Sequence, residues 1–214
     1  MNLKEPFVIA VSREIGSGGH TVGQILADRL NIRYYDKYLI EVLEDRFNLS
    51  IDEIERRKGE RKNWLADFFQ HITPFPSAKN MGADDRYTQE YKRDVTTDDI
   101  YKAETEILLE LANEGSCVIA GRSGFHVFRN HPNHLSVFVT ASEENRIQRV
   151  MRKQGLTEES AVALIRDIDK KRENYIKRYT GTSRYDVHNY DLVLNADGHS
   201  EEQLADIILT YLAE

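Results

Sequence analysis

The 214-residue chain is 40% hydrophobic and 30% charged, a composition that suits one globular domain with a real core and a well-solvated surface. Its formal net charge of −7 argues against a dedicated nucleic-acid-binding protein, and Cys117, the single cysteine, excludes a disulfide framework or a cysteine-based metal cluster. No stretch approaches a membrane span in length and MNLKEP lacks a signal-peptide pattern, so we expect a cytoplasmic protein without a membrane partner.

The first half of the chain alternates strand and helix patterns. The apolar run at 7–12 predicts a buried parallel strand, and beyond the glycines that follow it apolar residues continue at helical spacing as far as Leu30. Asn31 is expected to end that helix. The segment IRYYD predicts a second strand ending at Asp36, a helix follows, and prolines predict a loop over 71–86.

The second half continues the alternation. A helix is expected over 97–113, followed by a third buried strand, SCVIAG, and a fourth, HLSVFVTA. Ser142 is expected to cap the next helix and Gly155 to stop it, while Thr157 caps another that runs to about residue 179. The segment YDLVLNA predicts the last strand, and SEEQLADIILTYL predicts an amphipathic terminal helix. The pattern predicts an α/β fold, a parallel sheet with helices on both faces.

Candidate binding residues follow three of the predicted strands. A glycine-rich loop follows the first strand, Asp36 ends the second, and Arg122 follows the third. Because ligands of such sheets bind at the carboxyl ends of the strands, we expect a functional site there.

The glycine-rich loop is a candidate phosphate-binding loop. Its candidate nucleotide-binding residues are Gly16, Ser17, Gly18, Gly19, His20 and Thr21. Between a buried strand and a helix, backbone amides and the helix dipole favour an anion, and glycines let the backbone close around phosphate oxygens. Thr21 lies in the first helical turn, where a hydroxyl can bind Mg²⁺. The alternative is an ordinary tight glycine turn.

The loop lacks the lysine of the usual G-x-x-x-x-G-K-[ST] pattern. Arg13 is the nearest permanent cation. His20 could occupy the lysine position as a pH-dependent substitute, or it could be an ordinary residue of the helix N-terminus.

Positive charge is concentrated in 146–184, which holds eleven Lys and Arg residues and five Asp and Glu residues. This basic segment on an otherwise acidic chain suggests a small polyanionic ligand, whereas charge alone favours a solvated helix with ion pairs four residues apart.

Several motifs, in this order, resemble the cytidylate kinase-like family within the P-loop nucleoside monophosphate kinases. The resemblance covers 7–40 and 116–212 and is weak or absent across about 41–113. The motifs are VSREIGSGGHTVG, YYDKYLI, CVIAGRSGFHVF, SVFVTASEENRIQRV, RDIDKKRENYIKRYTG and YDLVLNA.

The resemblance implies a P-loop kinase-like three-layer sandwich with three parts. These are a core of 1–40, 114–145 and 185–214, an inserted helical lobe of about 41–113 for the acceptor, and a helical lid of about 146–184. It implies that the loop holds the phosphates of ATP with Mg²⁺, and that Arg122 contacts the phosphate of the acceptor.

The remaining site residues also follow from the resemblance. Asp169 and Arg172 match a D-x-x-R pair that contacts cytosine or its phosphate region, and Asp36 lies near the acceptor. Arg146 and Arg149 lie at the base of the lid. The candidate catalytic residues are Arg13, Arg122 and Arg146.

Alternatives remain for several of these arginines. Arg166, Asp169 and Arg172 could form an ion-pair ladder on one helix face. Arg146, Arg149 and Arg152 could form another solvated face. The aromatic residues of 64–75 could stack on an acceptor base, although a helix core or a subunit contact in a homo-oligomer is the more ordinary interpretation.

Two functions follow from these observations. The first is an ATP- and Mg²⁺-dependent phosphotransferase acting on a nucleoside monophosphate, nominally CMP, or a similar small acceptor. The second, suggested by the missing lysine, is a degenerate kinase that binds nucleotide without transferring phosphate.

Overall fold

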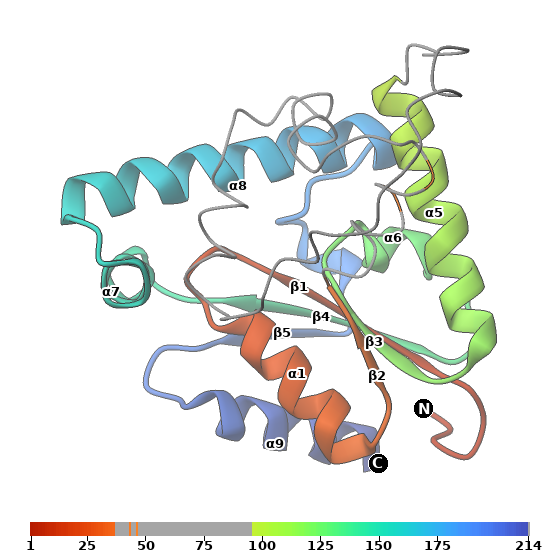
Figure 1. The fold of residues 1–214 in the computed structure, drawn as a ribbon. Coiled ribbons are helices and arrows are strands. Elements are labelled where there is room, and N and C mark those ends of the chain that lie inside the picture. The colour runs from red at the N-terminus through yellow and green to blue at the C-terminus, as the bar shows by residue number, and fades with distance from the viewer. Residues whose placement is uncertain (37–42, 44–45, 47–95, 214) are drawn as a thin grey trace, which may run out of the picture.

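A parallel sheet of five strands forms the centre of the protein in a computed structural model that describes residues 1–36, 43, 46 and 96–213 (Figure 1). The strands lie in the order β2-β3-β1-β4-β5, and every neighbouring pair is parallel. Their bounds are β1 (Val8–Arg13), β2 (Arg33–Tyr35), β3 (Cys117–Ala120), β4 (His134–Thr140) and β5 (Leu192–Asn195). The predicted α/β class and parallel sheet are confirmed.

Helices cover both faces of the sheet and make three layers (Figure 1). One apolar core joins a face of the sheet to α1 and α9, and a second joins the other face to α5 and the short α6. The bounds are α1 (Gly19–Leu30), α5 (Thr97–Glu114), α6 (Gly124–Val127), α7 (Glu143–Gln154), α8 (Glu158–Thr180), η1 (Val187–Asn189) and α9 (Glu201–Ala213).

The capping signals in the sequence set the ends of these helices. Ser142 accepts a hydrogen bond from the Asn145 amide to begin α7, and Gly155 ends it in the left-handed region at φ 65°. The hydroxyl of Thr157 likewise begins α8. Asn31, at φ 53°, ends α1 as predicted. The one-turn helix α6 and the 3-10 turn η1 were not predicted, because each is too short to show a hydrophobic period.

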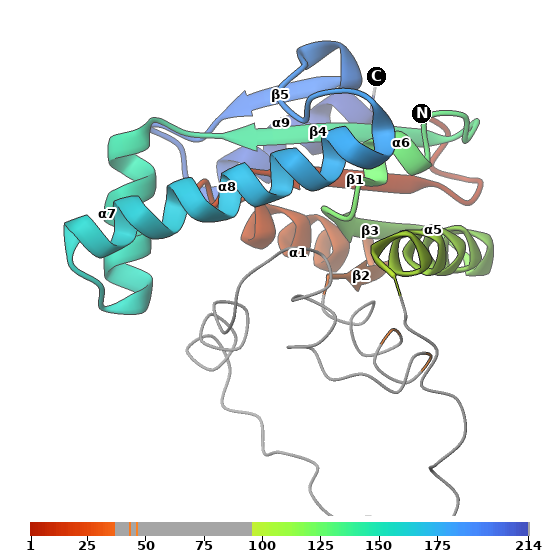
Figure 2. The same ribbon diagram turned by 90° about the horizontal axis from the view of Figure 1, so that it is seen from above.

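Helix α7 lies beyond the carboxyl end of β4 and forms an arm together with α8 (Figure 2). Buried residues of both helices pack with Ile15 of the glycine loop in a separate apolar cluster. From α7, α8 runs back towards α5, where the rings of Tyr101 and Tyr179 stack with centroids 4.3 Å apart. The arm therefore contacts the glycine loop near one end and α5 near the other.

The proposed inserted lobe, about 41–113, lies mostly outside the described residues, and so does the aromatic stretch at 64–75. Its last part, α5, packs on the sheet as one of the covering helices. Within the described ranges, none of the helices has the length and apolar character needed to cross a membrane.

Candidate functional site

The glycine loop joins β1 to α1 and presents a helix N-terminus without a side-chain cap. Gly16 and Gly18 have φ values of 81° and 88°, which only glycine adopts without strain. A Cβ on Gly16 would lie 2.7 Å from the carbonyl oxygen of Arg146. The first turn of α1 carries no acidic residue. These backbone amides and the helix dipole therefore suit an anion.

A cavity of about 390 Å³ lies between this loop and α7. Its wall includes most of the loop, together with Thr21 of α1, Arg149 of α7 and Arg172 of α8. Ser17 is buried, and its hydroxyl donates to the carbonyl oxygen of Glu14 at 3.0 Å, so this side chain shapes the turn. A cavity of about 570 Å³ lies beside Arg33 and Glu114, away from the glycine loop.

The side chain of Arg13 crosses the end of β3 between two glycines. A Cβ on Gly19 would lie 2.6 Å from the Arg13 Cβ, and a Cβ on Gly121 would fall on Arg13 Nη1. Beyond Gly121, Arg13 Nη2 lies 3.1 Å from Oδ1 of Asp36. Because Gly19 and Gly121 have no side chains, there is room for Arg13 to link β1 to the end of β2.

Asp36 is a largely buried carboxylate surrounded by donors. Burial by itself would raise its pKa. The charge of Arg13, a hydrogen bond and charge interaction with His20, and the charge of Arg122 outweigh burial and hold the pKa of Asp36 well below its usual range. His20 Nδ1 lies 2.7 Å from Asp36 Oδ2, and the Tyr34 hydroxyl donates to the His20 carbonyl oxygen at 3.1 Å. His20 therefore faces Asp36, on the side of β2.

Arg122 follows β3 with a φ of 55°, in the left-handed region. Its Nη1 donates to Oε1 of Glu104 at 3.1 Å, and the Tyr175 hydroxyl donates to Oε2 of the same residue at 2.6 Å. Glu104 is 2% exposed. Burial, followed by the charge and hydrogen bond of Glu104, raises the pKa of Tyr175 far above its usual value. The ion pair links Arg122 to α5, and the hydrogen bond from Tyr175 links α8 to the same carboxylate.

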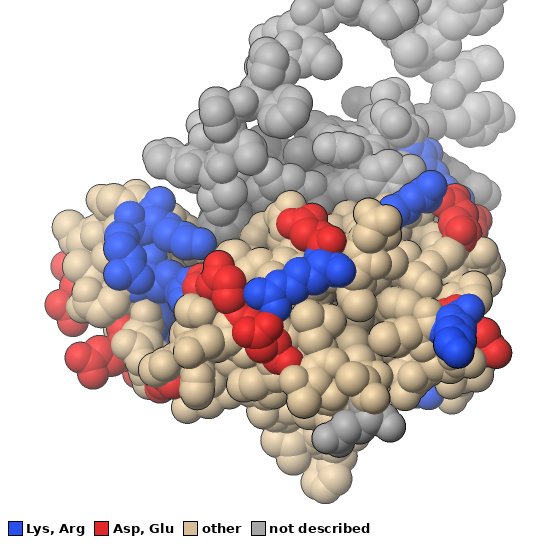
Figure 3. Space-filling view, turned by 90° about the horizontal axis from the view of Figure 1, so that it is seen from below, with Lys and Arg blue, Asp and Glu red and all other residues tan. Residues whose placement is uncertain are grey.

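Arg149 provides the guanidinium group that lies over the glycine loop. A Cβ on Gly18 would lie 3.1 Å from Arg149 Nη1, and Arg149 is also paired with Glu201 at the start of α9. Burial opposes ionisation of Glu201, but the bond from Arg149 lowers its pKa overall. Figure 3 shows Lys and Arg side chains gathered at the end of the molecule that α7 forms.

A sequence model of the cytidylate kinase-like family matches residues 8–198. The chain belongs to the cytidylate kinase-like family. It is 24% identical to a cytidylate kinase of Sulfolobus acidocaldarius over 202 residues, which cover 94% of this chain and 91% of that protein.

Two solved structures resemble this member of the cytidylate kinase-like family. An uncharacterized protein from Eubacterium ventriosum has a TM-score of 0.68 and 23% identity, with 97% of this chain and 99% of that one covered. Shikimate kinase from Bacteroides thetaiotaomicron has a TM-score of 0.55 and 16% identity, with coverage of 97% and 99%. These likenesses show the P-loop kinase fold.

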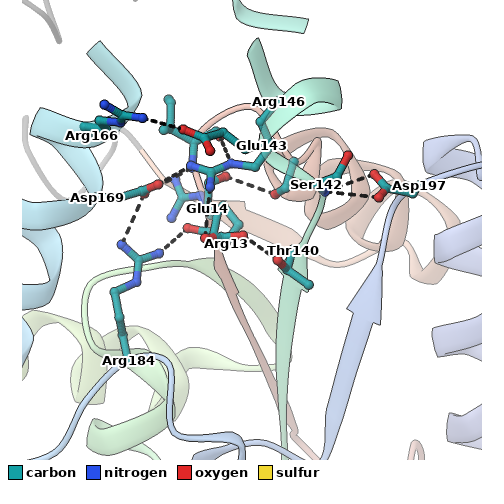
Figure 4. A network of polar contacts seen from close by, with 12 residues as sticks. Arg13, Glu14, Thr140, Ser142, Glu143, Arg146, Arg166, Asp169, Arg184 and Asp197 are labelled. Atoms are coloured by element: carbon teal, nitrogen blue, oxygen red, sulfur yellow. Dashed lines mark hydrogen bonds and ion pairs between the residues drawn. The ribbon is translucent and has the colours of Figure 1, made fainter. Parts of the chain in front are cut away.

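Two predicted site residues of this cytidylate kinase-like protein contact the backbone of the loop. Arg146 and Asp169 are 7% exposed, form an ion pair, and belong to a network that also contains Glu14 and Arg184 (Figure 4). By contrast, Arg166 is exposed and pairs with Glu143 of α7. Arg166, Asp169 and Arg172, for which an ion-pair ladder was the alternative, therefore lie in a surface pair, a buried network and the cavity wall respectively.

Arg184 is a site residue that the sequence did not single out. It is 3% exposed, and its Nη2 donates to the carbonyl oxygen of Arg13. Among the described residues, its Nε and Nη1 have no hydrogen-bond partner, although Nη1 lies 3.7 Å from Asp169 Oδ1. Its guanidinium carbon lies 5.9 Å from the centroid of the Phe138 ring. The only signal in the sequence was an arginine immediately after the long basic helix.

Proposed function

We propose that the protein is an ATP- and Mg²⁺-dependent phosphotransferase that transfers the γ-phosphoryl group of ATP to a nucleoside monophosphate, nominally CMP. One observation carries the proposal: an uncapped helix N-terminus with a glycine loop beside guanidinium groups from separate elements. These groups belong to Arg13, Arg149 and Arg172. Phosphoryl transfer depends on positioning and charge neutralisation, and this arrangement can supply both.

The donor half of the proposal rests on the loop and the cavity beside it. The loop amides suit the β- and γ-phosphates, and the cavity between the loop and α7 is open to the rest of the nucleotide. Thr21 lies in the cavity wall, so its hydroxyl fits a ligand to Mg²⁺, and the described residues contain no group of three His, Cys, Asp or Glu side chains that could hold a metal by themselves. When bound, Mg²⁺ would neutralise phosphate oxygens.

Arg149 is our candidate for the charge that a lysine supplies elsewhere. Its guanidinium group lies against Gly18, whereas the side chains of Arg13 and His20, which also line the cavity, are both paired with Asp36. A guanidinium group can donate two parallel hydrogen bonds to phosphate oxygens. The sequence placed Arg149 only at the base of the lid.

The acceptor half of the proposal rests on the carboxyl ends of β2 and β3. Arg13 and Arg122 both interact with Asp36, so two guanidinium groups and one carboxylate adjoin the end of the loop. The arginines would hold an anionic acceptor, and Asp36 would orient them. The oxygen of the acceptor phosphate forms the new bond to phosphorus as the bond to ADP breaks.

The test is ADP formation from ATP and Mg²⁺ with a panel of nucleoside monophosphates and small hydroxyl compounds. Acceptor-dependent turnover is expected, with CMP among the substrates. Absence of turnover with any acceptor, in a folded protein that binds ATP, would contradict the enzyme proposal.

The missing lysine supports a second candidate, a nucleotide-binding protein without transferase activity. The variants Arg13→Ala and Arg122→Ala separate the two functions. In an enzyme they lower turnover more than affinity for ATP, whereas in a binding protein only affinity can change. Both variants need a check of folding, because Asp36 and Glu104 each lose an ion-pair partner.

A further inference from the structure

The α7–α8 arm packs against the glycine loop and hydrogen-bonds its backbone. We propose that Arg146, Asp169 and Arg184 are positioning residues that set the backbone of the loop, so that packing of the arm and binding of the phosphate donor are coupled. This inference goes beyond the proposed function. Only the measurements of the Kd for MgATP and the KM for the acceptor rest on that function.

Three side chains of the network bind the backbone from the last residue of β1 to the residue before the first glycine. Arg146 Nε donates to the Ile15 carbonyl oxygen at 2.8 Å, and the Ile15 amide donates to Asp169 Oδ1 at 3.3 Å. Arg184 donates to the carbonyl oxygen of Arg13. Both polar groups of the Ile15 backbone are thus satisfied by an ion pair whose members come from α7 and α8 (Figure 4).

The same network is balanced in charge and nearly excluded from water. Two carboxylates, Glu14 and Asp169, face two guanidinium groups, Arg146 and Arg184, and their side chains are between 3% and 12% exposed. Arg146 Nη1 lies 3.0 Å from Glu14 Oε1. Removing one member leaves an uncompensated buried charge, so each member constrains the positions of the others.

Apolar and backbone contacts support the polar ones. The Ile15 side chain is buried with Ile147, Val150 and residues of α8. Gly16 lies so close to the backbone of Arg146 that a Cβ there would meet both its carbonyl oxygen and its Cα. The loop therefore has no room to change its path unless α7 moves with it.

These contacts account for Asp169 differently from the family resemblance, which implies a contact with cytosine or its phosphate region. One oxygen of Asp169 accepts from Ile15, the other accepts from Arg146, and Arg184 lies beside the first. The carboxylate faces the donor loop, so its loss should affect the donor. A direct contact to cytosine would instead predict an effect on the acceptor.

The experiment compares Asp169→Asn and Arg146→Lys with wild type and with Arg166→Gln. Arg166 is the matched control, because it lies on α8, like Asp169, but forms an exposed ion pair. Arg146→Lys keeps the charge while removing the Nε bond to Ile15, so it serves if Asp169→Asn does not fold. Amide hydrogen exchange of 13–19 is measured without nucleotide, followed by the Kd for MgATP and the KM for the acceptor.

We expect amide exchange of the loop and the Kd for MgATP to rise about tenfold in both variants, the size expected for one charge-assisted hydrogen bond. The acceptor KM should stay within about twofold, and the control should match wild type. Unchanged exchange in the loop, or a rise in the acceptor KM alone, would overturn the proposal. If wild type does not bind ATP, the proposed function fails and the exchange data alone decide the positioning role.

Discussion

Arg13 Nη2 lies 3.1 Å from Asp36 Oδ1, so the ends of β1 and β2 are linked across β3, the strand that separates them in the sheet. The side chain passes over Gly121, the residue that follows β3. This link joins the donor loop to the acceptor side of the site, and the glycine that permits it can be tested directly.

Gly121→Ala should weaken the link. The new Cβ would fall on Arg13 Nη1, displacing the guanidinium group and leaving Asp36 without its strongest partner. Gly198→Ala is the matched control, since Gly121 and Gly198 share a φ of 77° and the control position is open. In urea unfolding, Gly121→Ala should lose about 2 kcal/mol more than the control, the cost of an unsatisfied buried polar group. Equal losses would contradict this account.

The ionised Asp36 should make stability depend on pH. Its pKa is lower in the folded than in the unfolded protein, so its contribution is present above the ordinary carboxyl pKa of about 4 and is lost as the pH falls below it. Asp36→Asn should therefore be less stable at pH 7 and should lose less stability between about pH 4 and pH 2. Urea unfolding at a series of pH values checks this, and parallel curves for the two proteins would contradict it.

Much of the fold could be predicted because its signals are local. Continuous apolar runs identified the buried strands. Ser142 and Gly155 mark the two ends of α7, and Thr157 marks the start of α8. The strand order could not be read from these patterns, since it depends on contacts between distant segments. The alternation of strands and helices predicted only that the sheet is parallel, and the observed sheet agrees with that prediction.

The site was less predictable, because its geometry depends on residues far apart in the sequence. The pairing of Arg146 with Asp169 spans 23 positions, and that of Arg13 with Asp36 also spans 23. Arg184 belongs to no sequence motif and to no hydrophobic period, so the sequence did not single it out. Its burial beside the loop distinguishes it in the structure. Arg122 was identified from its place after a strand, but its partner Glu104 was hidden in an ordinary helical pattern.

Arg122→Ala should destabilise the protein as well as impair turnover. It leaves Glu104, which is 2% exposed, without its guanidinium partner, and breaking a buried ion pair costs about 3 kcal/mol. Adding Glu104→Gln removes the stranded charge and should restore about half of the lost stability without restoring turnover. Chemical unfolding and ADP release of the single and double variants distinguish the effects. A double variant less stable than Arg122→Ala would refute the pairing argument.

Arg149→Ala should weaken donor binding selectively. Its guanidinium group lies over Gly18, and loss of one charge-assisted contact to a phosphate should raise the Kd for ATP by about ten- to a hundredfold. Arg152→Ala, an exposed change on the same helix, should alter it by less than about twofold. Isothermal titration calorimetry with ATP and with AMP measures the difference. The loss should be small for AMP, which lacks the β- and γ-phosphates, and an equal loss for both ligands would rule out this role.

The most direct test of the central claim, that backbone amides and guanidinium groups replace the missing lysine, is titration of the wild-type protein with MgATP while the backbone amides of 16–21 are followed by NMR. We predict saturable binding, with the largest shift changes at Gly18 and Gly19 and a raised melting temperature. Unchanged amide signals at millimolar MgATP, with no change in melting temperature, would contradict the account.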